Sequence, residues 1–172
     1  MKRTITLCLA AGLTTGALLQ ADTAAAQQLS YAISGTDRAV DPATLEARAA
    51  ELYSSPKQYR RAAAFLMEAA ELRAAADPMR VKNKSLAARL YYYDGDKDRA
   101  RSLLEQAADD AIAAGDVVTA ADLYLDASYV AHEEKDGPEV LRLAAKAKLL
   151  MSSPLVDARS RDRVLSRIAE NV

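Results

Sequence analysis

Two short patterns recur along this chain at nearly constant spacing, and they constrain its fold more than any other feature. The pattern Ala-Ala-x-Leu-Tyr occupies residues 49–53, 87–91 and 120–124, with copies 38 and 33 residues apart. A second pattern, two large apolar residues followed after two positions by two alanines, alternates with the first at residues 65–70, 103–108 and 140–145. This alternation predicts one structural unit copied three times, each copy burying its apolar face against its neighbours.

The units are predicted to be pairs of α-helices. Ala, Leu, Arg, Glu and Asp dominate the chain, which has no Trp and one Phe, and runs of β-branched residues are missing. Apolar residues at helical spacing and Asp, Gly, Ser and Pro breaks predict seven helices, at about residues 42–53, 57–76, 78–93, 97–114, 117–135, 138–151 and 155–171. Short turns make neighbouring helices antiparallel. The predicted fold is therefore all-α, a solenoid of three antiparallel helix pairs plus a C-terminal capping helix.

Residues 42–151 resemble the tetratricopeptide repeat family. The family's tyrosine is present at Tyr53, Tyr91 and Tyr124, and its A-x3-F element appears as Ala62-x3-Leu66 and Ala100-x3-Leu104. The chain departs from the family pattern at several points: the Trp is absent, Ala-Ala replaces Leu-Gly, and the closing Pro is absent or displaced to Pro78. In the third copy Gly137 takes the place of the A-x3-F alanine. A related helical-repeat family fits these residues nearly as well.

The resemblance implies that the first helix of each pair lines a concave groove, with its two alanines and its tyrosine packed inward. The residue between the alanines and the Leu-Tyr pair then faces the groove, which gives Glu51, Arg89 and Asp122. Tyr92 and Leu125 follow one turn later, and Ser85 and Val118 come one turn earlier. We predict Glu51, Arg89, Tyr92 and Asp122 as the partner-binding residues. An ordinary solvated helix face is the alternative.

Tyr91-Tyr92-Tyr93 cannot form one stacking surface, because successive helical residues point about 100° apart. We expect Tyr91 in the core, Tyr92 in the groove and Tyr93 at the turn. In the final helix, Val164, Leu165 and Ile168 are expected to cover the last pair. Its charged residues are expected to face water (Arg159, Arg161, Asp162, Arg163 and Arg167).

The N-terminal residues predict export. Lys2 and Arg3 precede an apolar run of about 15 residues and the small residues of an Ala-x-Ala site, the pattern of a secretory signal peptide. Residues 1–26 are therefore interpreted as a signal peptide, residues 27–40 as a flexible leader and residues 41–172 as the repeat domain. The expected location is the periplasm or the cell exterior, with no membrane span after cleavage. An uncleaved anchor is the alternative, although the run is shorter than a bilayer requires.

The remaining composition excludes several function classes. Loss of Lys2, Arg3 and Asp22 with the signal peptide changes the formal net charge from −1 to −2 and argues against nucleic-acid binding. Cys8 is the only cysteine, so the processed chain has neither a disulfide nor thiol chemistry. No nucleotide-binding or serine-hydrolase motif is present. The chain is therefore predicted to be neither an enzyme nor a cofactor carrier.

Two local motifs suggest metal binding but have simpler interpretations. Residues 94–98, with Glu105, place carboxylates at the first, third, fifth and twelfth positions of a calcium loop, yet Arg99 replaces the required glycine. Asp96 is better interpreted as a helix cap. His132 is the only histidine and has no partner at zinc-site spacing.

These observations predict an exported scaffold that binds a protein or peptide in the groove, with a role in an envelope assembly as one setting. Two alternatives remain open. One is a binder of a small molecule or a cell-envelope polymer in the same groove. The other is a hydrolase with an unrecognised acidic pair.

Overall fold

The computed structural model describes residues 40–171, so the predicted signal peptide and nearly all of the predicted leader lie outside the described residues. Seven α-helices and a short 3-10 helix occupy this part of the chain: α2 (Pro42–Leu52), η1 (Pro56–Gln58), α3 (Tyr59–Glu71), α4 (Pro78–Tyr93), α5 (Lys97–Ala113), α6 (Val117–Glu133), α7 (Gly137–Met151) and α8 (Ala158–Asn171). Within residues 40–171 there is no strand, and no helix is long and apolar enough to cross a membrane.

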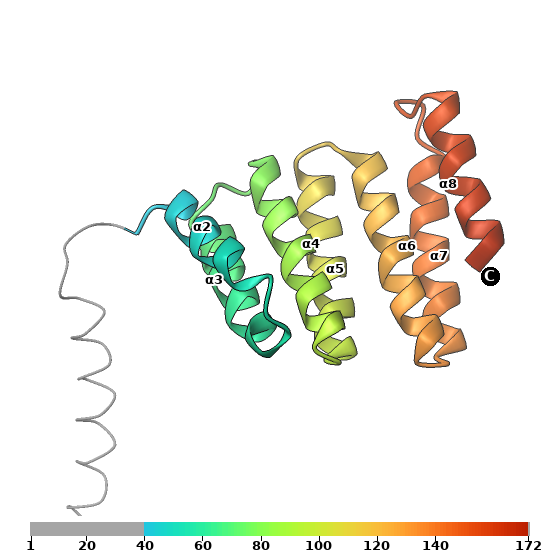
Figure 1. Cartoon of the computed structure of the whole chain (residues 1–172). Coiled ribbons are helices and arrows are strands. Elements are labelled where there is room, and N and C mark those ends of the chain that lie inside the picture. Colours follow the sequence, from blue (N-terminus) through green and yellow to red (C-terminus); the bar gives the residue numbers. More distant parts are fainter. Residues whose placement is uncertain (1–39, 172) are drawn as a thin grey trace, which may run out of the picture. The chain divides into compact units, whose positions relative to one another are not determined.

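The helices follow one another in space in the order of the sequence (Figure 1). Each helix from α2 to α7 packs on the next, and α8 packs on both α6 and α7. The pairs α2–α3, α4–α5 and α6–α7 form the successive layers of an all-helical solenoid, with α8 as the capping helix. The predicted fold class is therefore confirmed.

Aspartates set where five helices begin. The side chains of Asp77, Asp96, Asp116, Asp136 and Asp157 each accept a hydrogen bond from a backbone N–H in the first turn of the following helix. At three of these junctions the residue directly before the capping aspartate has a positive φ, as is common just after the end of a helix: Gly95, Gly115 and Lys135. The Asp94-Gly95-Asp96 segment is thus a helix end followed by a cap, as expected. The described residues contain no cluster of acidic, His or Cys side chains suited to a metal ion.

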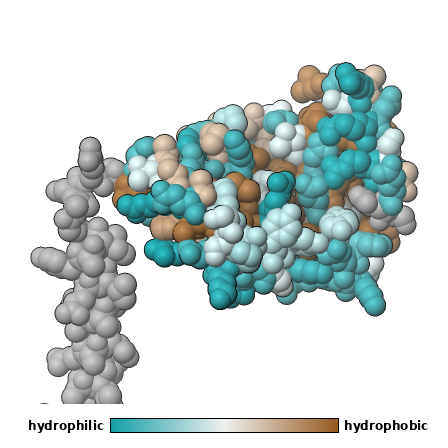
Figure 2. All heavy atoms as spheres, in the orientation of Figure 1, coloured by the Kyte–Doolittle hydropathy of each residue, from teal (hydrophilic) through white to brown (hydrophobic). Residues whose placement is uncertain are grey.

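Small side chains allow the helices to pack closely. Alanines at equivalent places in the second helices of the pairs, Ala69, Ala107 and Ala147, are completely buried. The paired alanines 87–88 and 120–121 of the first helices are also fully buried. Larger residues, among them Leu66, Leu125 and Leu143, fill the remaining space at 1% exposure or less. Figure 2 shows a mostly hydrophilic surface with apolar side chains visible in the seams between helices.

Helix boundaries correct the register of the third copy. α5 and α7 begin at Lys97 and Gly137, 40 residues apart, so Leu143 and Ala147 align with Leu103 and Ala107, and all four are buried. In the third copy Leu143 and Ala147 therefore take the buried places of Leu103 and Ala107, and the assignment of the second pattern to residues 140–145 was wrong in register. Leu141, at 58% exposure, shows the error directly.

The first pattern also shifts within its helix but keeps its face. α4 and α6 end 40 residues apart, at Tyr93 and Glu133, whereas the pattern copies are 33 residues apart. The difference of seven residues is close to two turns, so Tyr124 remains buried like Tyr91. Ala50 is exposed, contrary to expectation, because no described helix lies before α2 to cover it.

One partly buried ionic cluster joins the first and second pairs, and another joins the two helices of the second pair. Glu46 of α2 accepts hydrogen bonds from Arg73 (Nη2–Oε1 2.7 Å) and from the buried Asn83 (Nδ2–Oε1 2.7 Å). In the other cluster, Asp110 of α5 pairs with Lys84 (2.7 Å) and with Arg80 (3.0 Å), both on α4. The Lys84 side chain is only 5% exposed. These bonds add directional polar contacts to helix surfaces that otherwise pack through alanines.

Candidate functional site: a hollow between α4, α6 and α8

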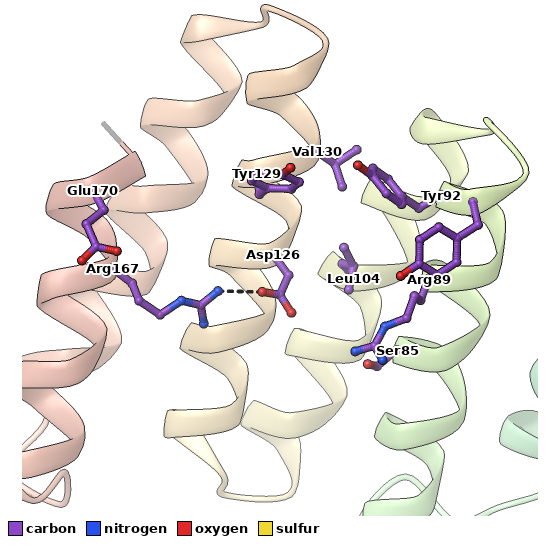
Figure 3. A pocket seen from close by; sticks show the side chains of 10 residues that line it. Ser85, Arg89, Tyr92, Leu104, Asp126, Tyr129, Val130, Arg167 and Glu170 are labelled. Atoms are coloured by element: carbon purple, nitrogen blue, oxygen red, sulfur yellow. Dashed lines mark hydrogen bonds and ion pairs between the residues drawn. The ribbon is translucent and has the colours of Figure 1, made fainter.

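Helices α4, α6 and α8, with one residue of α5, line a hollow of about 340 Å³ (Figure 3). The residues that line it are Ser85, Arg89, Tyr92 and Tyr93 of α4, Leu104 of α5, Asp126, Tyr129 and Val130 of α6, and Arg167 and Glu170 of α8. We call this hollow the groove. Its volume lies in the range of sites that hold a small ligand or an anchoring side chain of a partner.

Helical spacing explains why these side chains meet. Ser85, Arg89 and Tyr92 are separated by four and three residues, which places them on one face of α4. Asp126 and Tyr129 of α6 and Arg167 and Glu170 of α8 share the same spacing. Because α4, α6 and α8 lie in succession on one side of the solenoid, their stripes face a common space, with Leu104 and Val130 as its apolar floor.

Most charges on one wall of the groove are already neutralised. Arg167 of α8 donates hydrogen bonds to Asp122 (2.8 Å) and to Asp126 (2.7 Å) of α6. Arg163 binds the same Asp122 at 2.8 and 3.3 Å. These four residues form an ionic lattice that fastens α8 to α6. Figure 3 shows Arg167 reaching from α8 to Asp126.

Arg89 differs from these neighbours. Its side chain is exposed, and it forms no ion pair with any residue in the range 40–171. Figure 3 shows its guanidinium directed from α4 toward the wall that Asp126 and Arg167 form. The groove therefore contains an uncompensated positive charge on the α4 side. Glu170, on the α8 side, is likewise without an ion pair among the described residues.

Aromatic rings at one end of the groove are held in place by a shared carboxylate. Tyr92 and Tyr129 both donate their hydroxyl protons to Glu133, at 2.8 and 3.0 Å, and Lys97 lies 3.0 Å from the same carboxylate. Tyr93 makes an edge contact with Tyr92, at a ring-centroid distance of 5.6 Å. The hydrogen bonds to Glu133 restrict the rings of Tyr92 and Tyr129. The Tyr129 ring nevertheless remains 48% exposed.

The hydrogen bond to Glu133 predicts how Tyr92 ionises. It raises the pKa of Tyr92 to about 12, with burial and the charge of Glu133 adding to the effect. A raised phenol pKa stabilises the fold below pH 10, and this contribution is lost as the pH rises through 12. The contribution of Tyr92 is the difference in phenolate absorbance between the unsubstituted protein and Tyr92→Phe. We expect this difference to appear well above pH 10 as the pH is raised. Glu133→Gln is expected to return that step toward pH 10, and Glu134→Gln is the matched control. A Tyr92 step at pH 10 in the unsubstituted protein would contradict the geometry.

The structure separates the four residues predicted for partner binding. Arg89 and Tyr92 both line the groove. Asp122 lies beside it on the same face of α6, but its carboxylate is occupied by Arg163 and Arg167. Glu51 is exposed on α2, outside the set of lining residues.

One neighbouring expectation fails and a second holds only in part. Leu125 is completely buried and belongs to the core, because the groove side of α6 continues from Asp122 through Asp126, four residues on. Arg159, Asp162 and Arg163 are exposed as expected, whereas Arg161 and Arg167 are half-buried. Arg161 donates hydrogen bonds to backbone carbonyls at the end of α7 and in the loop after it, and Arg163 and Arg167 bind α6. Ser85 does line the groove, and Val118 is half-buried.

Sequence reasoning missed the α6 and α8 contributions to the groove, namely Asp126, Tyr129, Arg167 and Glu170. One signal for them was present: the spacing of Arg163 and Arg167 matches that of Asp122 and Asp126. Residues four apart lie on one helix face, so these arginines and aspartates could pair if the two helices packed together. Only a capping role was predicted for the last helix.

The described fold and site define a class of protein: an all-helical repeat protein with a charged, aromatic groove on the side of its first helices. Comparisons of the chain with family models, curated proteins and solved structures gave no match.

Proposed function

We propose that the protein is an exported, tetratricopeptide-like scaffold that binds a segment of another protein in the groove. The observation that carries this proposal is the uncompensated guanidinium of Arg89 beside exposed tyrosine rings and an apolar floor. Arg and Tyr are enriched among the residues that contribute most to binding at the centres of protein interfaces.

A binding role accounts for these residues better than a catalytic one. The carboxylate in the centre of the groove, Asp126, is ion-paired with Arg167. The groove lining contains no histidine, and His132 is exposed at the end of α6. What the groove offers is a shaped surface with two charged side chains, Arg89 and Glu170, that have no ion pair among the described residues, and such a surface suits recognition.

The test is co-purification of partners from the native cell envelope. The bait is the full chain with a tag joined through a flexible linker, compared with an Arg89→Glu, Tyr129→Ala variant. Both substituted residues are exposed, and neither contributes to the ionic lattice. Asp122 is left intact, because its loss would release α8 and confuse a folding defect with a binding defect.

A matched control carries Glu68→Ala and Lys148→Ala, two exposed residues on the second helices. The proposal expects a protein that co-purifies with the unsubstituted and control baits and is lost from the groove variant. Retention of the same proteins by all three baits would refute binding in the groove.

The groove volume also suits a second candidate, a small molecule or an envelope polymer stacked on the tyrosines. Cell-wall fragments that raise the melting temperature saturably, and fail to do so with Tyr129→Ala, would favour this candidate. No shift in melting temperature at any fragment concentration would exclude those fragments as ligands.

A further inference from the structure

We infer that the groove recognises a polypeptide segment in which an acidic side chain lies next to an apolar one, the acid binding Arg89 and the apolar side chain occupying the space between Tyr92 and Tyr129. This inference rests on the proposed function, because it names the chemistry of the partner for the same groove.

The charges of the two groove walls indicate that the partner places an acidic side chain at Arg89. On the α6–α8 wall, Asp122 and Asp126 are matched by Arg163 and Arg167 at 2.7 to 2.8 Å. On the opposite wall, Arg89 has no ion pair among residues 40–171. A partner gains little by competing for charges that are already paired, whereas an acid at Arg89 gains a charge-assisted hydrogen bond without breaking one.

The apolar floor and the two tyrosine rings indicate that the partner also inserts an apolar side chain. Leu104 is 8% exposed and Val130 is 4% exposed, so the protein core covers most of both side chains and only a small part of each faces the groove. Tyr92 and Tyr129 hold their rings through Glu133, so little further ordering is required when a side chain is inserted. An aliphatic or aromatic side chain buried here contributes the apolar contact that a single exposed ion pair cannot provide.

The position of Glu170 sets a direction. It lines the groove from α8, whereas Arg89 lines it from α4. An acidic residue placed toward α8 would meet this carboxylate, so the acidic end of the bound segment lies on the α4 side. A basic residue at the other end of the segment would match Glu170.

The test uses a displayed library of random peptides, selected on the purified full-length protein, on Arg89→Glu and on Tyr129→Ala. We expect the unsubstituted protein to enrich Asp or Glu beside Leu, Ile, Phe or Tyr. Arg89→Glu should enrich Lys or Arg in the same place, because the sign of the wall charge is reversed. Tyr129→Ala should weaken all selected peptides while leaving the acidic preference in place.

A charge-exchange cycle in solution completes the test. The strongest selected peptide and its acid-to-lysine form are titrated against the unsubstituted protein and Arg89→Glu by fluorescence anisotropy. Each mismatched combination should bind about tenfold more weakly than its matched counterpart. Glu68→Lys, on an exposed second-helix position, is the control for general charge effects.

The outcomes distinguish the inference from the proposed function. Peptides that depend on Tyr129 but show no acidic preference, or the same preference with Arg89→Glu, would overturn the inference and leave the groove as a binding site. If no peptide is enriched relative to the Arg89→Glu, Tyr129→Ala variant, the proposed function fails with it.

Discussion

Asp110→Ala is expected to destabilise the protein by about 3 kcal/mol, the lower end of the range for breaking a buried ion pair. The carboxylate of Asp110 lies 2.7 Å from the ammonium of Lys84, whose side chain is only 5% exposed. Removal of Asp110 leaves that charge without a close partner, because the nearest other carboxylate, Glu71, is 3.9 Å away and largely exposed. The measurement is urea denaturation followed by circular dichroism.

Asp98→Ala is the control for a carboxylate that pairs on the surface. Asp98 is 85% exposed and binds Arg101 within a single turn of α5, so its loss should cost at most about 0.5 kcal/mol. The combination of Lys84→Met with Asp110→Ala should recover part of the stability, because the buried charge is then absent. Equal losses for Asp98→Ala and Asp110→Ala would contradict the assigned burial of Lys84.

The position of Lys84 shows what a single sequence reveals about such a pair. Lys84 precedes Ala87, Ala88 and Tyr91 by three, four and seven residues, so helical periodicity places it on the buried side of α4. Lys82, two residues earlier, is exposed. The periodicity therefore identifies the buried lysine. Its partner is 26 residues away on another helix, and the pairing depends on how α4 and α5 pack, which the pattern does not specify.

The helical fold could be predicted because the signals are local and repeated. Capping aspartates, prolines at first helical positions and alternating apolar patterns each determine only a few residues, yet they agree along the whole described chain. The register of the third copy was less secure. In an alanine-rich helix, residues 140–145 match the pattern in sequence, although Leu143 and Ala147 take the equivalent buried places, and Leu141 and Ala145 are exposed.

The site was predicted only on the side where the repeat pattern applied. Arg89 and Tyr92 belong to an internal copy, so the family resemblance indicated their direction correctly. The other wall depends on α8, whose arginines bind α6 across about 40 residues of sequence. A capping helix does not repeat, so its contacts follow from its own packing. Asp122 was placed on the correct face but is occupied by a neighbour that the pattern omitted.

Leu125 tests the boundary between core and groove most directly. Sequence spacing placed it in the groove one turn after Asp122, whereas the structure buries it completely. Leu125→Ala is therefore expected to cost about 3 kcal/mol, the sum of lost apolar burial and the cavity left behind. Urea denaturation measures the loss. Leu149→Ala, at a residue 73% exposed on α7, should change stability by less than about 0.5 kcal/mol.

The binding assay gives the complementary result. The Leu125→Ala protein is assayed below its melting temperature. It should bind a groove-selected peptide as tightly as the unsubstituted protein does, because the Leu125 side chain lies in the core and not in the groove. Tyr129→Ala should show the reverse behaviour, with weakened binding and a small change in stability, since its ring is 48% exposed. A Leu125→Ala variant that unfolds normally but binds weakly would instead place that side chain in the groove. The face of α6 that meets the partner would then pass through residue 125 rather than Asp126 and Tyr129.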